Sequence, residues 1–214
     1  MISIAKNGEP RSLTEHRATS HSTYENYAAK DELRASLVAE QFGLCCYCMS
    51  RIRSEADSMK IEHWQCQDRY APRQLEYANL LGACLGGHGS PRHKQHCDTR
   101  KGNADLKWNP ADPAHAIDSR VHYGTDGGAW SNDDDFSQQL DDVLNLNLVV
   151  LKNSRKGVLD GIVLWWKAEK ARLKGPVPRT TFERELSRCS DGPSRQPFCG
   201  VAIWWLRERI GRMS

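Results

Sequence analysis

Four cysteines in the middle of the chain constrain its fold more than any other feature of the sequence. Cys45 and Cys48 are separated by two residues, and Cys84 and Cys97 follow further along the chain. A Cys-x2-Cys turn can direct two thiolates at one metal ion, and four thiolates in this arrangement are typical of a tetrahedral structural zinc site. The sequence therefore predicts a Zn²⁺ ion bound by all four cysteines.

The spacing leaves two other interpretations of these cysteines open. A histidine from the second half of the motif could replace one thiolate, and the candidates are His88, His93 and His96. The four cysteines could also be unrelated buried residues. The remaining cysteines are expected to be free thiols: Cys46, Cys66, Cys189 and Cys199.

Length and composition set broad limits. A chain of 214 residues can bury one hydrophobic core. Its formal net charge of +3 permits a nucleic-acid partner without indicating one. The N-terminus does not resemble a signal peptide, and no apolar run approaches the roughly 18 residues that span a bilayer. We therefore expect a soluble, cytoplasmic protein with no membrane contact, whose thiols are reduced and available to metal.

We divide the chain into three regions. Residues 1–43 form an N-terminal arm and a helix, residues 44–110 a zinc-stapled core, and residues 111–214 a β-hairpin and helices that pack on the core as one unit. Within the first region, residues 1–23 are polar and irregular, whereas 25–42 have helical spacing. Gly43 is suited to the left-handed conformation that ends many helices.

The C-terminal region reads as a hairpin followed by helices. A glycine-rich turn within residues 120–130 predicts the hairpin, and the acidic run 133–135 is typical of a solvated loop or a helix cap. Apolar and tryptophan residues at helical spacing predict helices over 158–169 and 201–210. Their tryptophan pairs are expected in the core, with a partner-binding surface as the alternative. The predicted fold class is α+β.

Between the two cysteine pairs lies an acidic residue followed by a histidine, Glu62 and His63, in a segment compatible with a β-strand. Neighbouring side chains on a strand point to opposite faces, so both can serve one site only at a strand end or a distortion. Asn79 lies sixteen residues after His63. Asp98 directly follows the last cysteine of the zinc motif, and Lys101 comes three residues later.

This order of motifs resembles the HNH, or ββα-metal, endonucleases in their zinc-stapled form. The resemblance is closer still to one branch, the HNH nuclease subunits of the Septu and retron-associated anti-phage defence systems. Features outside the core carry that second resemblance. They are Met1-Ile-Ser-Ile, Pro10, Leu13, Glu40-Gln41, Leu144-Asn-Leu-Asn147, Leu151 and Arg155.

The family pattern implies a role for each matching residue. His63 would be the general base that activates a water, Glu62 a metal ligand, and Asn79 a residue that orients this pair. The chain departs from the family at Asp98, where His or Asn is usual. A carboxylate there could still bind Mg²⁺ or Mn²⁺ as the catalytic ion. Lys101, one helical turn later, could contact a phosphate.

A cluster of basic residues follows the motif and could either contact nucleic-acid phosphates or be solvated charge. Its members are Arg92, His93, Lys94, Arg100 and Lys101. The resemblance implies a phosphodiesterase acting on nucleic acid beside an ATPase partner subunit, with the C-terminal helices and the N-terminal arm as its docking surface. The alternatives are a zinc-stabilised, non-catalytic nucleic-acid-binding or adaptor module, and a standalone homing or restriction enzyme. Against the latter, no helix-turn-helix is recognisable in the flanks.

Overall fold

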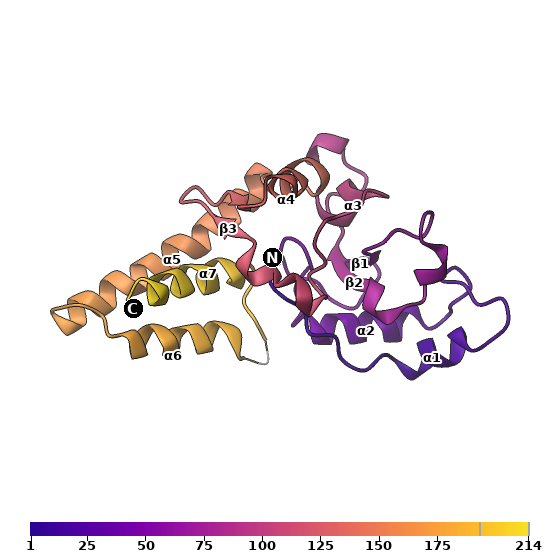
Figure 1. Cartoon of the computed structure of the whole chain (residues 1–214), viewed down its shortest axis with the longest axis horizontal. Coiled ribbons are helices and arrows are strands. Elements are labelled where there is room, and N and C mark those ends of the chain that lie inside the picture. The colour runs from indigo at the N-terminus through magenta and orange to yellow at the C-terminus, as the bar shows by residue number, and fades with distance from the viewer. Residues whose placement is uncertain (193, 214) are drawn as a thin grey trace.

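The computed structural model describes residues 1–192 and 194–213 and combines helices with two small antiparallel sheets. In Figure 1, three long helices extend to the left, while the first sheet and the N-terminal helices lie on the right. This mixture agrees with the α+β class. The helices are α1 (Arg11–Arg17), α2 (Lys30–Glu40), α3 (Cys97–Lys101), α4 (Asp134–Gln138), α5 (Val149–Leu173), α6 (Arg179–Ser190) and α7 (Cys199–Gly211). The strands are β1 (Met59–His63), β2 (Leu80–Cys84), β3 (His122–Tyr123) and β4 (Ala129–Trp130).

The expectation of an irregular arm over residues 1–23 was wrong, because this segment contains α1 and is held in the core. Helix α1 begins directly after Pro10 and buries Leu13 completely. Leu13 packs in a cluster with Leu33 and Leu37 of α2, so one apolar residue is enough to dock this short helix. Before α1, the Ile4 amide donates to the Pro110 carbonyl at 2.8 Å.

Helix α2 is shorter at its N-terminus than the predicted helix over 25–42. It begins at Lys30, where Asp31 and Glu32 lie in the first turn and favour the positive end of the helix dipole. Gly43 follows the helix with φ of +69°, as predicted. There, a Cβ would lie 2.9 Å from an Arg51 side-chain nitrogen, in a backbone conformation that L side chains rarely adopt.

Strands β1 and β2 pair in antiparallel register, with Glu62 opposite Leu81 and His63 opposite Leu80. Gln41, directly after α2, fixes the helix to this sheet. Its side-chain amide donates to the Gly82 carbonyl at 2.8 Å and accepts from the Gly82 amide at 2.6 Å. The backbone amide and carbonyl of Gly82 on β2 thus form hydrogen bonds with a side chain, at an edge where a further strand could otherwise pair.

The C-terminal region contains the expected hairpin, β3 paired with β4, and the expected helix cap. The Asp133 carboxylate accepts from the Phe136 amide at 3.0 Å at the start of α4. Helices α5 and α7 contain the two predicted helices, while α6 between them was not predicted. Tryptophan rings pack where these helices meet, as for Trp166 against Trp205 at 6.0 Å between centroids.

One hydrophobic cluster includes the central cysteines and residues of α5, α6 and α7, such as Leu159, Phe182 and Val201. The helices on the left of Figure 1 therefore share a core with the region of the cysteines. No helix in the described part of the chain is long and apolar enough to cross a membrane.

Candidate metal and catalytic site

The four central cysteines come together although they belong to separate elements. Cys45 and Cys48 lie in the turn after α2, Cys84 ends β2, and Cys97 begins α3. Their sulfur atoms all lie within 4.8 Å of one another, and all four residues are buried. The Sγ atoms of Cys48 and Cys84 are 3.7 Å apart. A tetrahedron with Zn–S bonds of about 2.3 Å has edges of about 3.8 Å, so this donor set fits zinc.

Separations of this size also distinguish the cluster from a pair of disulfides, whose bonded sulfurs lie about 2.0 Å apart. Burial acts to raise the pKa of the Cys45 thiol, but hydrogen bonds from the neighbouring thiols outweigh it and hold that pKa well below its ordinary value. Burial and hydrogen bonds within the cluster raise the pKa of the Cys97 thiol well above its ordinary value. The Cys45 thiol therefore ionises readily, whereas a full set of four thiolates requires a bound cation. Cys46 is outside the metal-binding group, and burial together with a hydrogen bond to the Cys45 thiol raises the pKa of its own thiol well above the ordinary value.

Of the three histidines that could replace a thiolate, His96 lies beside the cluster. The Nδ1 atom of His96 lies 3.2 Å from the Cys97 sulfur and 3.9 Å from that of Cys84. Among the described residues, the group that could hold a metal consists of the four cysteines without a histidine. His96 can therefore support two thiolates by hydrogen bonding, whereas His88 and His93 are exposed.

The segment before Cys97 contains residues with positive φ that bring its backbone close to the cluster. Cys97 itself has φ of +55°, and its amide donates to the Leu144 carbonyl at 2.9 Å. Gly86 also has a positive φ, and a Cβ there would lie 2.1 Å from the carbonyl oxygen of His96. The backbone at positions 86 and 96 can therefore come this close only because residue 86 is glycine.

Two carboxylates meet beside the thiol cluster. Glu62 on β1 is 2% exposed, and its pKa is raised well above the ordinary value by burial and by the nearby carboxylate of Asp98. The Oε1 atom of Glu62 accepts from the Tyr47 hydroxyl at 2.7 Å and lies 2.8 Å from the Lys101 ammonium. Asp98 lies 3.4 Å from the Lys60 ammonium. Two carboxylates this close can both ionise only beside positive charge.

His63 is the last residue of β1, the strand end at which both Glu62 and its neighbour can serve one site. Its Nε2 atom lies 3.0 Å from the Gln74 carbonyl oxygen. Because a carbonyl only accepts, Nε2 carries the proton and Nδ1 has the lone pair. The side chain of Gln67 reaches Nδ1 at 3.4 Å. Burial lowers the pKa of His63.

Asn79 is fully buried and holds the loop between β1 and β2. Its Oδ1 accepts from the Gln65 amide at 2.8 Å, and its Nδ2 donates to the carbonyls of Gln65 and Arg73 at 3.0 and 3.1 Å. The loop so held carries Gln74, whose carbonyl fixes the tautomer of His63. Asn79 is thus placed to act on His63 through the backbone.

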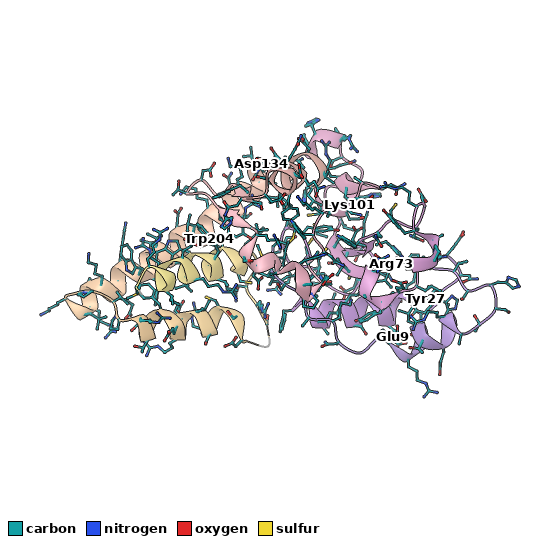
Figure 2. All side chains as sticks on the ribbon, viewed as in Figure 1. Glu9, Tyr27, Arg73, Lys101, Asp134 and Trp204 are labelled. Atoms are coloured by element: carbon teal, nitrogen blue, oxygen red, sulfur yellow. The ribbon has the colours of Figure 1, made fainter. Side chains whose placement is uncertain are left out.

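The basic cluster divides into exposed and buried members. Arg92 and Lys94 are exposed in a short turn before α3, and Arg100 is partly exposed, donating to the Arg92 carbonyl at 3.1 Å. Lys101 is only 4% exposed (its place on α3 is labelled in Figure 2). Its ammonium is engaged by Glu62 and by the His63 carbonyl at 3.2 Å, and contact of Lys101 with a phosphate stays a prediction.

Sequence reasoning missed three residues of the site. Tyr47 lies inside the Cys-x2-Cys turn and binds Glu62, and only its place between the cysteines could have drawn attention to it. Tyr24 packs its ring edge-on against His63 at 4.5 Å between centroids. Lys60 lies two residues before Glu62 on β1, on the same face of the strand, and pairs with Asp98.

Comparison with known proteins gave no further identification. No family model matches the chain, and no curated protein matches it.

Proposed function

We propose that the chain is a metal-dependent HNH endonuclease that hydrolyses nucleic-acid phosphodiester bonds, with β1, β2 and α3 as its ββα-metal core. The observation that carries this proposal is the buried Glu62 next to His63 at the end of β1, with the partly buried Asp98 of α3 close to Glu62. Two carboxylates and a neutral imidazole beside a four-thiol cluster give the parts that metal-assisted hydrolysis needs.

His63 is the general base in this proposal. Its Nε2–H is held by the Gln74 carbonyl, so Nδ1 is the atom that takes a proton from the attacking water. Its lowered pKa keeps the ring neutral near pH 7, which is the form that a base requires. Gln67, within reach of Nδ1, is placed to orient the water or to leave as the substrate arrives.

Glu62 and Asp98 would hold the divalent cation. Carboxylate oxygens are hard donors of the kind that Mg²⁺ and Mn²⁺ prefer, and the crowding of two carboxylates is relieved by a cation. When bound, the ion would neutralise charge on the phosphate oxygens and on the departing 3′ oxygen. Arg92, Lys94 and Arg100 remain candidates for contact with the nucleic-acid backbone.

The resemblance to the Septu and retron-associated nuclease subunits supports a role as the effector of an anti-phage complex with an ATPase partner subunit. Of the two candidate docking surfaces, the N-terminal arm is already used within the chain, since Met1 and Ile4 are buried. The exposed apolar residues of the C-terminal helices, Val150 and Leu164 among them, make α5 the better candidate.

One observation favours a non-catalytic, zinc-stabilised nucleic-acid-binding or adaptor module instead. His63 is only 6% exposed, and Lys101 already supplies a positive charge to Glu62. A binding module needs neither an accessible base nor a free carboxylate. This second candidate therefore differs from the first in a single measurable property, which is cleavage.

The test is cleavage of supercoiled plasmid, single-stranded DNA and RNA with Mg²⁺ or Mn²⁺, by the wild type and by His63→Ala at equal zinc content. His88→Ala is the matched control, because His88 is exposed and belongs neither to the thiol cluster nor to the basic cluster. We expect a loss of about 10²–10⁴-fold in rate for His63→Ala and none for the control. Nucleic-acid binding without cleavage by the wild type, also with an ATPase partner present, would support the adaptor module.

A further inference from the structure

Tyr47 connects the thiol cluster to the carboxylate pair. It lies between Cys46 and Cys48 in the zinc-binding turn and is fully buried. Its hydroxyl donates to the Oε1 atom of Glu62 at 2.7 Å, across fifteen positions of the chain. One side chain therefore belongs by its backbone to the four-thiol cluster and by its hydroxyl to the proposed cation site.

The turn around Tyr47 has little freedom. The Cys45 amide donates to the Ser50 carbonyl at 2.9 Å, and the Cys46 amide donates to the Gly82 carbonyl of β2 at 2.9 Å. With Cys45 and Cys48 bound to one ion, the backbone on both sides of Tyr47 is fixed. The ring of Tyr47 is packed in the hydrophobic core cluster, so the position of its hydroxyl is fixed.

Two donors meet one oxygen of Glu62. The Tyr47 hydroxyl donates to Oε1, and the Lys101 ammonium lies 2.8 Å from the same atom. Lys101 brings a positive charge that opposes the approach of a cation, whereas Tyr47 is a neutral donor. Tyr47 thus orients the carboxylate without competing electrostatically with a bound ion.

We propose that Tyr47 is a positioning residue that couples zinc occupancy to divalent-cation binding at Glu62 and Asp98. This inference rests on the proposed function, because it assumes that these carboxylates bind a cation. Residues that hydrogen-bond a metal ligand commonly change metal affinity by 10–100-fold when they are removed. Since coupling between two binding sites is reciprocal in free energy, the divalent cation also raises the affinity for zinc.

The first test is Mn²⁺ titration, followed by electron paramagnetic resonance, of the full-length, zinc-loaded protein. Tyr47→Phe keeps the ring and removes the hydroxyl. Tyr123→Phe is the matched control, since Tyr123 is also buried and its hydroxyl meets the Met1 amino group instead. We expect Mn²⁺ affinity to fall about 10–100-fold in Tyr47→Phe and less than 3-fold in Tyr123→Phe, at equal zinc content.

Equal Mn²⁺ affinity in Tyr47→Phe and the wild type would overturn the inference and leave the proposed function intact. A wild type that binds Mn²⁺ no better than Glu62→Gln would remove the cation site itself and both proposals with it. If Tyr47→Phe does not fold, the wild type provides a second measurement, the equilibrium partition of zinc between the protein and a colorimetric chelator. Saturating Mg²⁺ should shift this partition toward the protein in the wild type and not in Glu62→Gln, and an unchanged wild-type partition would overturn the coupling.

Discussion

Removing zinc should destabilise the whole protein, because the four cysteines cross-link distant parts of one core. Cys45 and Cys97 close a loop of 53 residues. A cross-link over such a loop restricts the unfolded chain by about 4 kcal/mol on the chain-entropy model. Structural zinc in isolated zinc fingers contributes more, about 10–16 kcal/mol, which approaches the entire stability of many domains. We take the smaller value as the minimum loss.

That minimum converts into a measurable change in melting temperature. For a chain of this length, 1 kcal/mol shifts the melting temperature by about 2–4 °C, so zinc loss should lower it by at least roughly 8 °C. Helices α5 and α7 should melt with the cysteine region, because both contribute to one hydrophobic cluster.

The assay is thermal unfolding followed by circular dichroism, with zinc measured by atomic absorption, for the wild type with and without chelator and for Cys97→Ser. Cys66→Ser is the control, since Cys66 is buried to a similar degree and lies outside the cluster. One zinc per chain that is removed with a change below 2 °C would refute the reasoning. So would a Cys66→Ser variant that loses zinc as Cys97→Ser does.

Three further predictions concern single positions. Asn79→Ala removes three hydrogen bonds that hold the loop before β2, so we expect the free energy of unfolding in urea to fall by about 1–3 kcal/mol. Cleavage should be slower with zinc retained, and unchanged cleavage would contradict the positioning role of Asn79. Gly86→Ala should lower zinc content, because its Cβ would meet the His96 carbonyl, whereas Gly89→Ala, with the same positive φ but open space, should retain zinc. Because burial lowers the pKa of His63 and the neutral ring is the base, kcat/KM should rise with pH and then level off, with the midpoint of the rise below the ordinary histidine pKa of 6.5. A midpoint above 6.5 would contradict this assignment.

The cysteine cluster could be predicted from sequence because its chemistry is local to a few residue types. A Cys-x2-Cys turn has few uses in a chain without disulfides, so the gathering of Cys84 and Cys97 beside it followed from composition and spacing. The strand that carries Glu62 and His63 was also predictable, and it ends at His63. The two side chains have different hydrogen-bond partners, Tyr47 for Glu62 and the Gln74 carbonyl for His63, so their action at one site stays a prediction. Whether a cation binds there stays a prediction.

Short or highly charged elements could not be predicted. Helix α1 has seven residues and one buried apolar side chain, too few for a periodic pattern to be visible. Helix α6 is mostly polar, and its helical state depends on Phe182 packing against Trp165 of α5. Lys101 was expected to contact a phosphate or to be solvated, whereas it is buried, and its place depends on Glu62, a partner 39 positions earlier.

Arg155 is a buried positive charge on α5. A zinc ion with four thiolates carries a formal charge of −2, and such a charge in a core is stable only near a counterion or many dipoles. Arg155 on α5 is 1% exposed and donates to the Gly127 and Leu146 carbonyls, both at 2.6 Å. Burial lowers its pKa, and the Cys48 and Cys97 thiols are among the groups that act to raise it. Helix α5 would therefore supply a buried positive charge to zinc bound by the four cysteines, so that zinc binding and the docking of α5 should stabilise each other.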